Sequence, residues 1–326
     1  MREQFFPAFD WHTVFIQPWS EYAVNSFWIV LMGFLVAGTC GLVGCFVILR
    51  RMALVGDAIS HSILPGITLA FLITNSRDTL PMMLGAVAAG VVTVALIEAI
   101  RYTSRIKPDA AIGIVFSSLF AIGVILISVF ADEVDLDTEC VLYGELGFIP
   151  LQDIAYFGGI VIGPEPVVRM AIITLIAIVL LFAFFKEMIV TSFDSGLAAS
   201  LGINPTRYQC GITLFLSIVI VSSFESVGVV LVIAMIIFPG ATALMLTDRL
   251  PIALVLSTVI SGAYSLIGFH LATWLNASIA GGMTVIAGIV FGIVWAFAPQ
   301  RGLIATFVRN RQIMEGSALN FSREEK

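Results

Sequence analysis

Apolar runs of membrane-spanning length dominate this sequence and restrict what it can fold into. A transmembrane helix needs about 20 predominantly apolar residues, and such runs recur along most of the chain. Hydrophobic residues make up 59% of the sequence and charged residues 12%, whereas soluble domains are about 45–50% apolar and about 25% charged. We therefore expect an all-α polytopic membrane protein, with spans near 26–49, 53–75, 81–100, 110–131, 167–185, 208–224, 227–247, 251–272 and 278–298.

The sixth and seventh runs are the least clearly separated. Only a short polar segment lies between them, containing Ser222, Ser223, Glu225 and Ser226. The two runs form either two spans or one broken element, so the expected total is eight or nine transmembrane helices.

Charged and aromatic residues predict how the chain is organised across the membrane. Residues 1–25 form an aromatic, extracytoplasmic lead-in, residues 26–298 the transmembrane domain, and residues 299–326 a short cytoplasmic tail. With the N-terminus outside, 13 lysine and arginine residues fall in cytoplasmic segments and three outside. Cytoplasmic loops normally carry this excess, which favours an N-terminus outside and a C-terminus inside.

A carboxylate and an imidazole interrupt the second apolar run. Asp57 and His61 are four residues apart, which places them on one helix face, one turn apart. Pro65 and Gly66 follow, and proline interrupts a helix because it lacks an N–H and clashes with the preceding turn. Ionisable groups in lipid usually mark a transport pathway, and transporters build such sites beside broken helices. The alternative is a structural hydrogen bond between packed helices.

The side chains of Asp57 and His61 suit Mn²⁺, Fe²⁺ or Zn²⁺, but they do not select among these ions, because the affinity of any such site rises from Mn²⁺ toward Zn²⁺. One chain supplies two ligands, and a two-fold dimer would supply four around its axis. Glu225 and His270 lie near the outer ends of their spans. Each is a second-tier candidate for a relay or entry ligand, or else a solvated or hydrogen-bonded residue.

The cytoplasmic segment 192–203 differs from the other loops. Phe193 and Asp194 lie where a helix N-cap is expected, and Gly202 lies where the helix should stop. Leu197, Ala198 and Leu201 form an apolar stripe. We expect a helix of about two turns that either packs on the membrane surface or docks in the groove of a partner.

The motifs of common enzymes are missing from these 326 residues. There is no GxxxxGK[ST] loop, so the sequence has no P-loop nucleotide site, and no HExxH or GxSxG motif that would indicate a protease. The four cysteines show no CxxC spacing. The sequence thus indicates a transport subunit rather than an enzyme, and with no basic patch it gives no sign of a nucleic-acid partner.

The longest outer loop, 132–166, is rich in acidic residues. Such a loop is either a funnel or docking face that attracts cations, or an ordinary solvated loop.

Three segments together resemble a known family. Residues 44–61, from Gly44 through Asp57 to His61, are similar to the permease subunits of bacterial ABC importers for manganese, zinc and chelated iron. The resemblance continues from Ser192 to Gly202 and from Gly228 to Ala243. The segment 134–144 looks more like the manganese and iron branch than the zinc branch. One departure is the pair Phe238 and Gly240 around Pro239, where that family often has smaller polar or alanine residues.

The resemblance implies a fold, a site and a set of partners. The fold is the all-helical permease of the inner membrane, in which Asp57 and His61 bind the metal, the segment from Asp194 to Gly202 docks on the ATPase, and Pro65–Gly66 and Pro239–Gly240 mark helix breaks. The partners are a pair of cytoplasmic ABC ATPases, an extracytoplasmic metal-binding protein, and a second permease copy or a paralogue. Transported Mn²⁺, or alternatively Fe²⁺ or Zn²⁺, is cargo rather than a resident cofactor.

Two other functions remain open from the sequence. A permease for an iron–chelate complex would share the architecture, but a bulky chelate needs no ligands for a bare ion. A proton-coupled secondary transporter could use Asp57 and His61 as a proton relay, but it would need no cytoplasmic docking helix.

Overall fold

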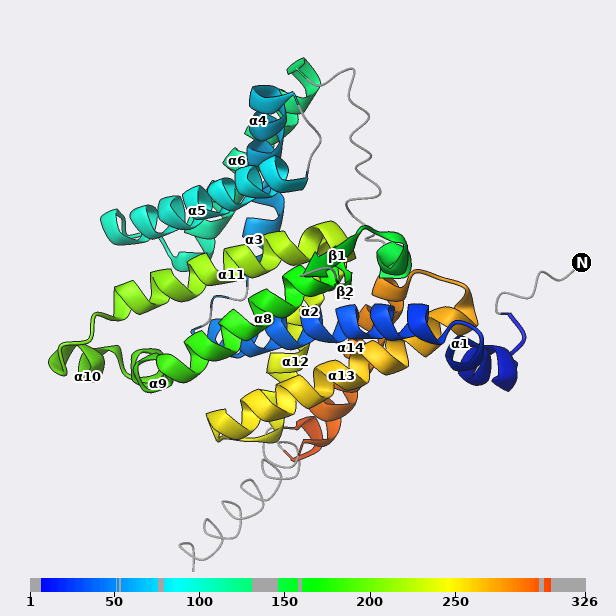
Figure 1. Ribbon diagram of the computed structural model, residues 1–326. Coiled ribbons are helices and arrows are strands. Elements are labelled where there is room, and N and C mark those ends of the chain that lie inside the picture. Colours follow the sequence, from blue (N-terminus) through cyan, green and yellow to red (C-terminus); the bar gives the residue numbers. More distant parts are fainter. Residues whose placement is uncertain are drawn as a thin grey trace, which may run out of the picture.

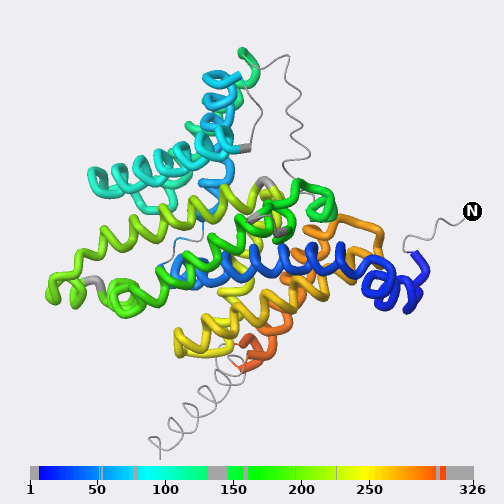
Figure 2. Tube along the Cα trace, viewed as in Figure 1, coloured from blue at the N-terminus to red at the C-terminus, as the bar shows by residue number. Residues whose placement is uncertain are grey.

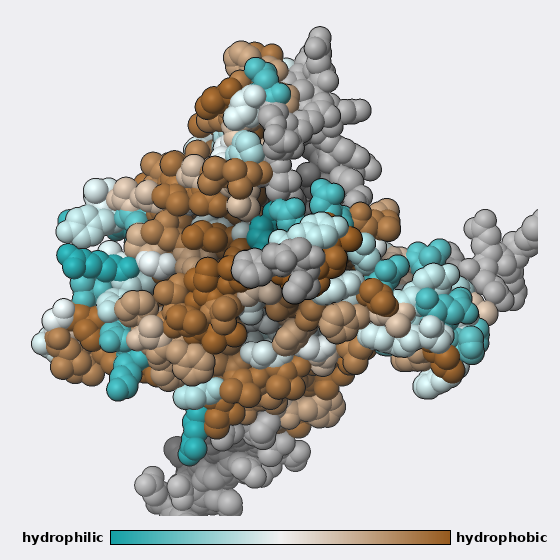
Figure 3. Space-filling model, viewed as in Figure 1, coloured by the Kyte–Doolittle hydropathy of each residue, from teal (hydrophilic) through white to brown (hydrophobic). Residues whose placement is uncertain are grey.

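The computed structural model describes residues 7–50, 52, 54–75, 79–130, 146–157, 160–298 and 302–305. Within them, nine helical segments are long and apolar enough to cross a membrane. The nine spans match the predicted ones to within a few residues at each end. Figure 3 shows a broad apolar surface between two ends where hydrophilic residues gather, as expected for a chain surrounded by lipid.

The helices lie in long, roughly aligned rows, with the small N-terminal helix α1 and the short helix α10 at opposite ends (Figures 1 and 2). In chain order the elements are η1 (His12–Ile16), α1 (Gln17–Ser20), α2 (Ala23–Leu49), α3 (Leu54–Ser62), α4 (Leu64–Thr74), α5 (Thr79–Thr103), α6 (Pro108–Phe130), η2 (Leu146–Leu151), β1 (Ile154–Phe157), β2 (Ile160–Pro164), α8 (Glu165–Ala183), α9 (Phe185–Phe193), α10 (Ser195–Ser200), α11 (Pro205–Val227), α12 (Val229–Leu246), α13 (Leu250–Leu275) and α14 (Ile279–Phe297).

Helix α2 is the centre of the fold. It is the most buried of the nine spans and packs against α12 and α13. Two serines of α13 donate hydrogen bonds to its backbone, Ser261 to the carbonyl of Ala37 at 3.0 Å and Ser265 to the carbonyl of Val30 at 2.7 Å. Hydroxyls and small residues let transmembrane helices approach closely, so this seam fixes α13 on α2.

The boundary between the sixth and seventh spans differs from the predicted one. Helix α11 continues through the serine-rich segment and ends at Val227, and α12 begins two residues later. Between them Gly228 has φ +78°, a backbone conformation that residues other than glycine rarely adopt. The serine-rich segment does not mark the boundary between the two spans, because a buried serine hydroxyl can donate a hydrogen bond to a carbonyl of its own helix. The hydroxyl of Ser223 does so to the carbonyl of Val219.

Helices α4, α5 and α6 pack on one another and form a separate group at the top of Figure 1. A polar network ties α5 to α11, where Glu98 accepts hydrogen bonds from Arg101 at 2.8 Å and from Gln209 at 3.1 Å. The network anchors this group to the rest of the bundle.

The loop before α8 contains a two-stranded antiparallel hairpin, in which Ile154 pairs with Pro164 and Phe157 with Ile160. Most of the acidic residues predicted to attract cations lie in 131–145, outside the described residues.

Candidate metal-translocation site

Asp57 and His61 lie on α3, in the broken second span. The Nε2 atom of His61 lies 3.5 Å from an Oδ1 atom of Asp57, and the side chains are 32% and 47% exposed, respectively. The i, i+4 spacing thus brings a carboxylate oxygen and an imidazole nitrogen to one open face of the helix. A cation could approach both atoms from that side.

An aromatic wall on α6 borders this face. The ring of His61 lies 5.5 Å from the ring of Phe116 and 5.8 Å from that of Phe120, measured between centroids. The two phenylalanines are four residues apart and stack at 6.0 Å. Neither phenylalanine was predicted from the sequence, although their i, i+4 spacing was the available signal.

The second span is interrupted at Ile63, two residues before Pro65. Helix α3 ends at Ser62 and α4 begins at Leu64, with Pro65 in its first turn. Proline is accepted there because the first N–H groups of a helix have no intrahelical partner. Any side chain at Gly66 would collide with the carbonyl oxygen of Gly85 on α5, so the motif also serves the close packing of α4.

The second predicted break is wrong. Helix α12 runs unbroken from Val229 to Leu246 through Pro239. Pro239 packs beside Gly41, and Gly240 beside Cys45, both on α2. Neighbouring helices make proline tolerable inside transmembrane helices, so these two residues mark a helix contact rather than an interruption.

Among the described residues, no three side chains of histidine, cysteine, aspartate or glutamate gather as a metal site would require. One chain can therefore supply at most half of the ligands of a metal ion, through the pair on α3.

His270 is held by the N-terminal lead-in. Trp19 donates its indole N–H to Nε2 of His270 at 3.3 Å, and Nδ1 lies 2.9 Å from the carbonyl oxygen of Val14. A neutral imidazole with its proton on Nδ1 satisfies both bonds, which favours the hydrogen-bonding role over an entry ligand. Glu225 belongs to α11, and its role stays a prediction.

The segment 192–203 contains the predicted helix in a shorter form, α10. Asp194 caps it, accepting hydrogen bonds from the backbone N–H groups of Gly196 and Leu197 at 3.0 and 2.9 Å. Gly202, with φ +79°, ends it. The N–H of Gly202 bonds to the carbonyl of Ala199, and that of Ile203 to the carbonyl of Ala198, the usual pattern of a glycine C-cap.

The apolar stripe of this segment needs one correction. Leu197 and Leu201 are 50% and 62% exposed, and Phe193 is 63% exposed, but Ala198 is fully buried. Residues four apart share a helix face, whereas Ala198 points about 100° away from Leu197 and packs inward. The exposed apolar face therefore consists of Phe193, Leu197 and Leu201.

Comparison with known proteins identifies the family that has this architecture. Residues 23–298, which include all nine spans, match the model of the ABC 3 transport family. The chain belongs to that family.

Individual members agree with this assignment. The chain is 42% identical over 291 residues to the manganese transport system membrane protein of Bacillus subtilis, covering 89% of this chain and 98% of that protein. It is 41% identical over 276 residues to the zinc transport system membrane protein of Treponema pallidum, covering 85% and 75%, respectively. The structure of PsaBC from Streptococcus pneumoniae in complex with Fab has a TM-score of 0.69 at 30% identity, covering 84% of this chain and 92% of that one.

This ABC 3 family member is thus a multi-pass membrane permease, and one contact in it joins the end of α2 to the end of α9. Arg50 follows the last residue of α2, just before α3, and donates hydrogen bonds to Thr191 at 2.8 Å and Ser192 at 3.1 Å. Both hydroxyls lie at the end of α9, immediately before the cap of α10. Burial lowers the pKa of Arg50 to about 10, so the guanidinium is still charged at neutral pH.

Proposed function

We propose that this chain is the permease subunit of an ATP-driven importer that moves a divalent transition metal, with Mn²⁺ first and Fe²⁺ or Zn²⁺ as alternatives. The observation that carries the proposal is the open Asp57–His61 pair beside a helix break. Oxygen and nitrogen ligands suit these ions, and thiolates would favour softer ones. The manganese transport system membrane protein of Bacillus subtilis, 42% identical to this chain, supports Mn²⁺.

The proposed assembly follows from what one chain lacks. A second permease copy, or a paralogue, would complete the metal ligands across a two-fold axis. A pair of cytoplasmic ABC ATPases would bind the exposed face of Phe193, Leu197 and Leu201. An extracytoplasmic metal-binding protein would deliver the ion on the side of the lead-in, with the N-terminus outside and the C-terminus inside.

Reconstitution tests this function against its rivals. In proteoliposomes containing the permease, its ATPase and its metal-binding protein, we expect Mn²⁺ to enter only when ATP is supplied on the ATPase side. Entry driven by a proton gradient without ATP would indicate a secondary transporter. Entry of an intact ferric chelate in place of the bare ion would indicate a chelate permease.

Protons should compete with the metal at this site. A histidine ligand must be neutral and a carboxylate ligand ionised. Protons therefore compete with the metal ion for these ligand atoms as the pH falls below neutrality. We expect Mn²⁺ affinity of the isolated permease, measured by calorimetry, to weaken steadily between pH 7.5 and pH 5.5 on this account. The His61→Gln variant should bind weakly with a flatter pH profile, and an equally steep profile in this variant would contradict the role of His61.

Arg50 should transmit motion of the ATPase to α3. Its guanidinium spans two hydroxyls of α9, and hydrogen bonds from charged groups contribute about 1.5–3 kcal/mol each. We expect Arg50→Ala to lower metal uptake per ATP hydrolysed about tenfold while the ATPase still co-purifies. Arg50→Lys keeps the charge without the planar fork and should recover only part of the loss.

The control for Arg50 is Arg249→Ala, because Arg249 is an arginine that also flanks a span, at the start of α13, but its side chain is exposed. Unchanged uptake per ATP in Arg50→Ala would show that this contact is only structural.

A further inference from the structure

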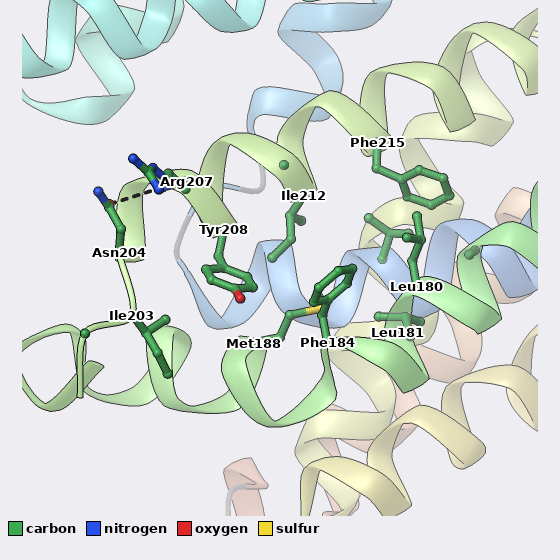
Figure 4. A pocket seen from close by; sticks show the side chains of 14 residues that line it. Leu180, Leu181, Phe184, Met188, Ile203, Asn204, Arg207, Tyr208, Ile212 and Phe215 are labelled. Atoms are coloured by element: carbon green, nitrogen blue, oxygen red, sulfur yellow. Dashed lines mark hydrogen bonds between the residues drawn. The ribbon is translucent and has the colours of Figure 1, made fainter. Parts of the chain in front are cut away.

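A cavity of about 560 Å³ opens between α8, α9 and the first turns of α11. Figure 4 shows Leu180, Leu181 and Phe184 on one side and Ile212 and Phe215 on the other. Phe184 and Tyr208 meet edge to face, with ring centroids 6.1 Å apart. The volume lies in the range of about 300–1,000 Å³ typical of small-molecule sites.

The cavity is apolar in its depth and polar at its mouth. Its polar side chains, Asn204, Arg207 and Tyr208, lie at the start of α11, where this span begins. From Arg207 to Phe215 the lining follows α11 for eight residues, about 12 Å into the span. No carboxylate is among the lining residues.

Arg207 is available at this mouth. Its side chain is exposed, and among the residues that the structure describes it has neither an ion pair nor a side-chain hydrogen bond. The hydrogen bond drawn in Figure 4 runs from the backbone N–H of Arg207 to Oδ1 of Asn204, at 3.4 Å, and so leaves the guanidinium uninvolved.

We propose that this cavity binds an anionic phospholipid, with one acyl chain in the apolar depth and the phosphate at Arg207. The proposal rests on the proposed orientation, which puts the mouth at the cytoplasmic leaflet. An apolar slot with a cation at the membrane boundary fits an anionic amphiphile, since arginine pairs well with phosphate oxygens and basic pockets between spans bind lipid headgroups. The lipid would lie beside Gly202 and Ile203, directly after α10.

Two substitutions separate the headgroup from the chain. Arg207→Gln removes the charge and leaves the slot intact. Gly211→Leu fills the slot, because a β-carbon at Gly211 would have no neighbour within 4 Å, and leucine favours a helix interior more than glycine does. The matched controls are Arg249→Gln, at the start of α13, and Gly113→Leu, in the second turn of α6, where a β-carbon also meets nothing within 4 Å.

Native mass spectrometry of the detergent-purified permease tests the proposal, with phosphatidylglycerol and phosphatidylcholine of identical chains titrated separately. We expect the wild type and both controls to retain phosphatidylglycerol more tightly than phosphatidylcholine. Arg207→Gln should weaken phosphatidylglycerol binding about fivefold and leave phosphatidylcholine unchanged. Gly211→Leu should weaken the retention of both lipids.

Two results would overturn the proposal. The first is equal binding of the two lipids by the wild type, and the second is a loss in the controls as large as in the test variants. The measurement uses no metal and no transport, so its failure leaves the import function untouched.

Discussion

Asp57→Asn and His61→Gln should each abolish metal import while the protein still reaches the membrane. Each variant keeps the size of the side chain and removes one ligand from the pair on α3. Loss of an outer-shell partner alone typically costs about 10–100-fold in metal affinity or activity, so loss of a ligand should cost about 100-fold or more. The measurement is initial ⁵⁴Mn²⁺ uptake at limiting metal, normalised to permease in the membrane.

Two controls match these variants. Asp109→Asn changes an exposed aspartate in the first turn of α6, and His12→Gln changes an exposed histidine of the lead-in. Both should import metal normally. If Asp57→Asn and His61→Gln also import normally at limiting metal, the pair is a structural hydrogen bond and the pathway lies elsewhere.

Leu201→Glu and Leu197→Glu should release the ATPase from an otherwise intact permease. Both leucines are at least half exposed on the outer face of α10, so the charge costs little in the free permease. In a docked groove, an unpaired buried carboxylate costs of order a few kcal/mol. We expect the ATPase to be lost on co-purification and import to stop, while metal binding at Asp57 and His61 is kept.

The control for this experiment is Leu151→Glu, because Leu151 is 76% exposed in η2, outside the α9–α10 segment. Ala198→Glu is not a useful probe, since Ala198 is fully buried and the charge would disturb α10 itself. Co-purification of the ATPase with both leucine variants, together with normal import, would show that α10 is a surface element without a coupling role.

Much of this fold followed from the sequence because spans in lipid have a strong local signal. Every backbone group must be satisfied within the helix, so apolar length alone located all nine spans. The pairing of Asp57 with His61 and the cap at Asp194 also depend on spacing along one helix, and both are present.

The features that the sequence did not reveal depend on neighbours distant in the chain. Pro239 stays helical because α2 packs beside it. Ala198 is buried, although its place between Leu197 and Leu201 in the sequence predicted an exposed apolar stripe. The wall of Phe116 and Phe120 next to His61 joins helices that are far apart in sequence. The preference of a sequence segment for one secondary structure gives no information about such contacts, since tertiary packing decides them.

The central position of α2 has a consequence for biogenesis. This helix leaves the ribosome well before its main partners α12 and α13, which begin at Val229 and Leu250. At about 5–20 residues per second, the 179 residues between Leu49 and Val229 take roughly 9–36 seconds to synthesise. During that interval the small-residue seam of α2 faces lipid or the insertion machinery. Assembly of the permease therefore depends on an early helix whose face for α12 and α13 stays uncovered until those two helices have been made.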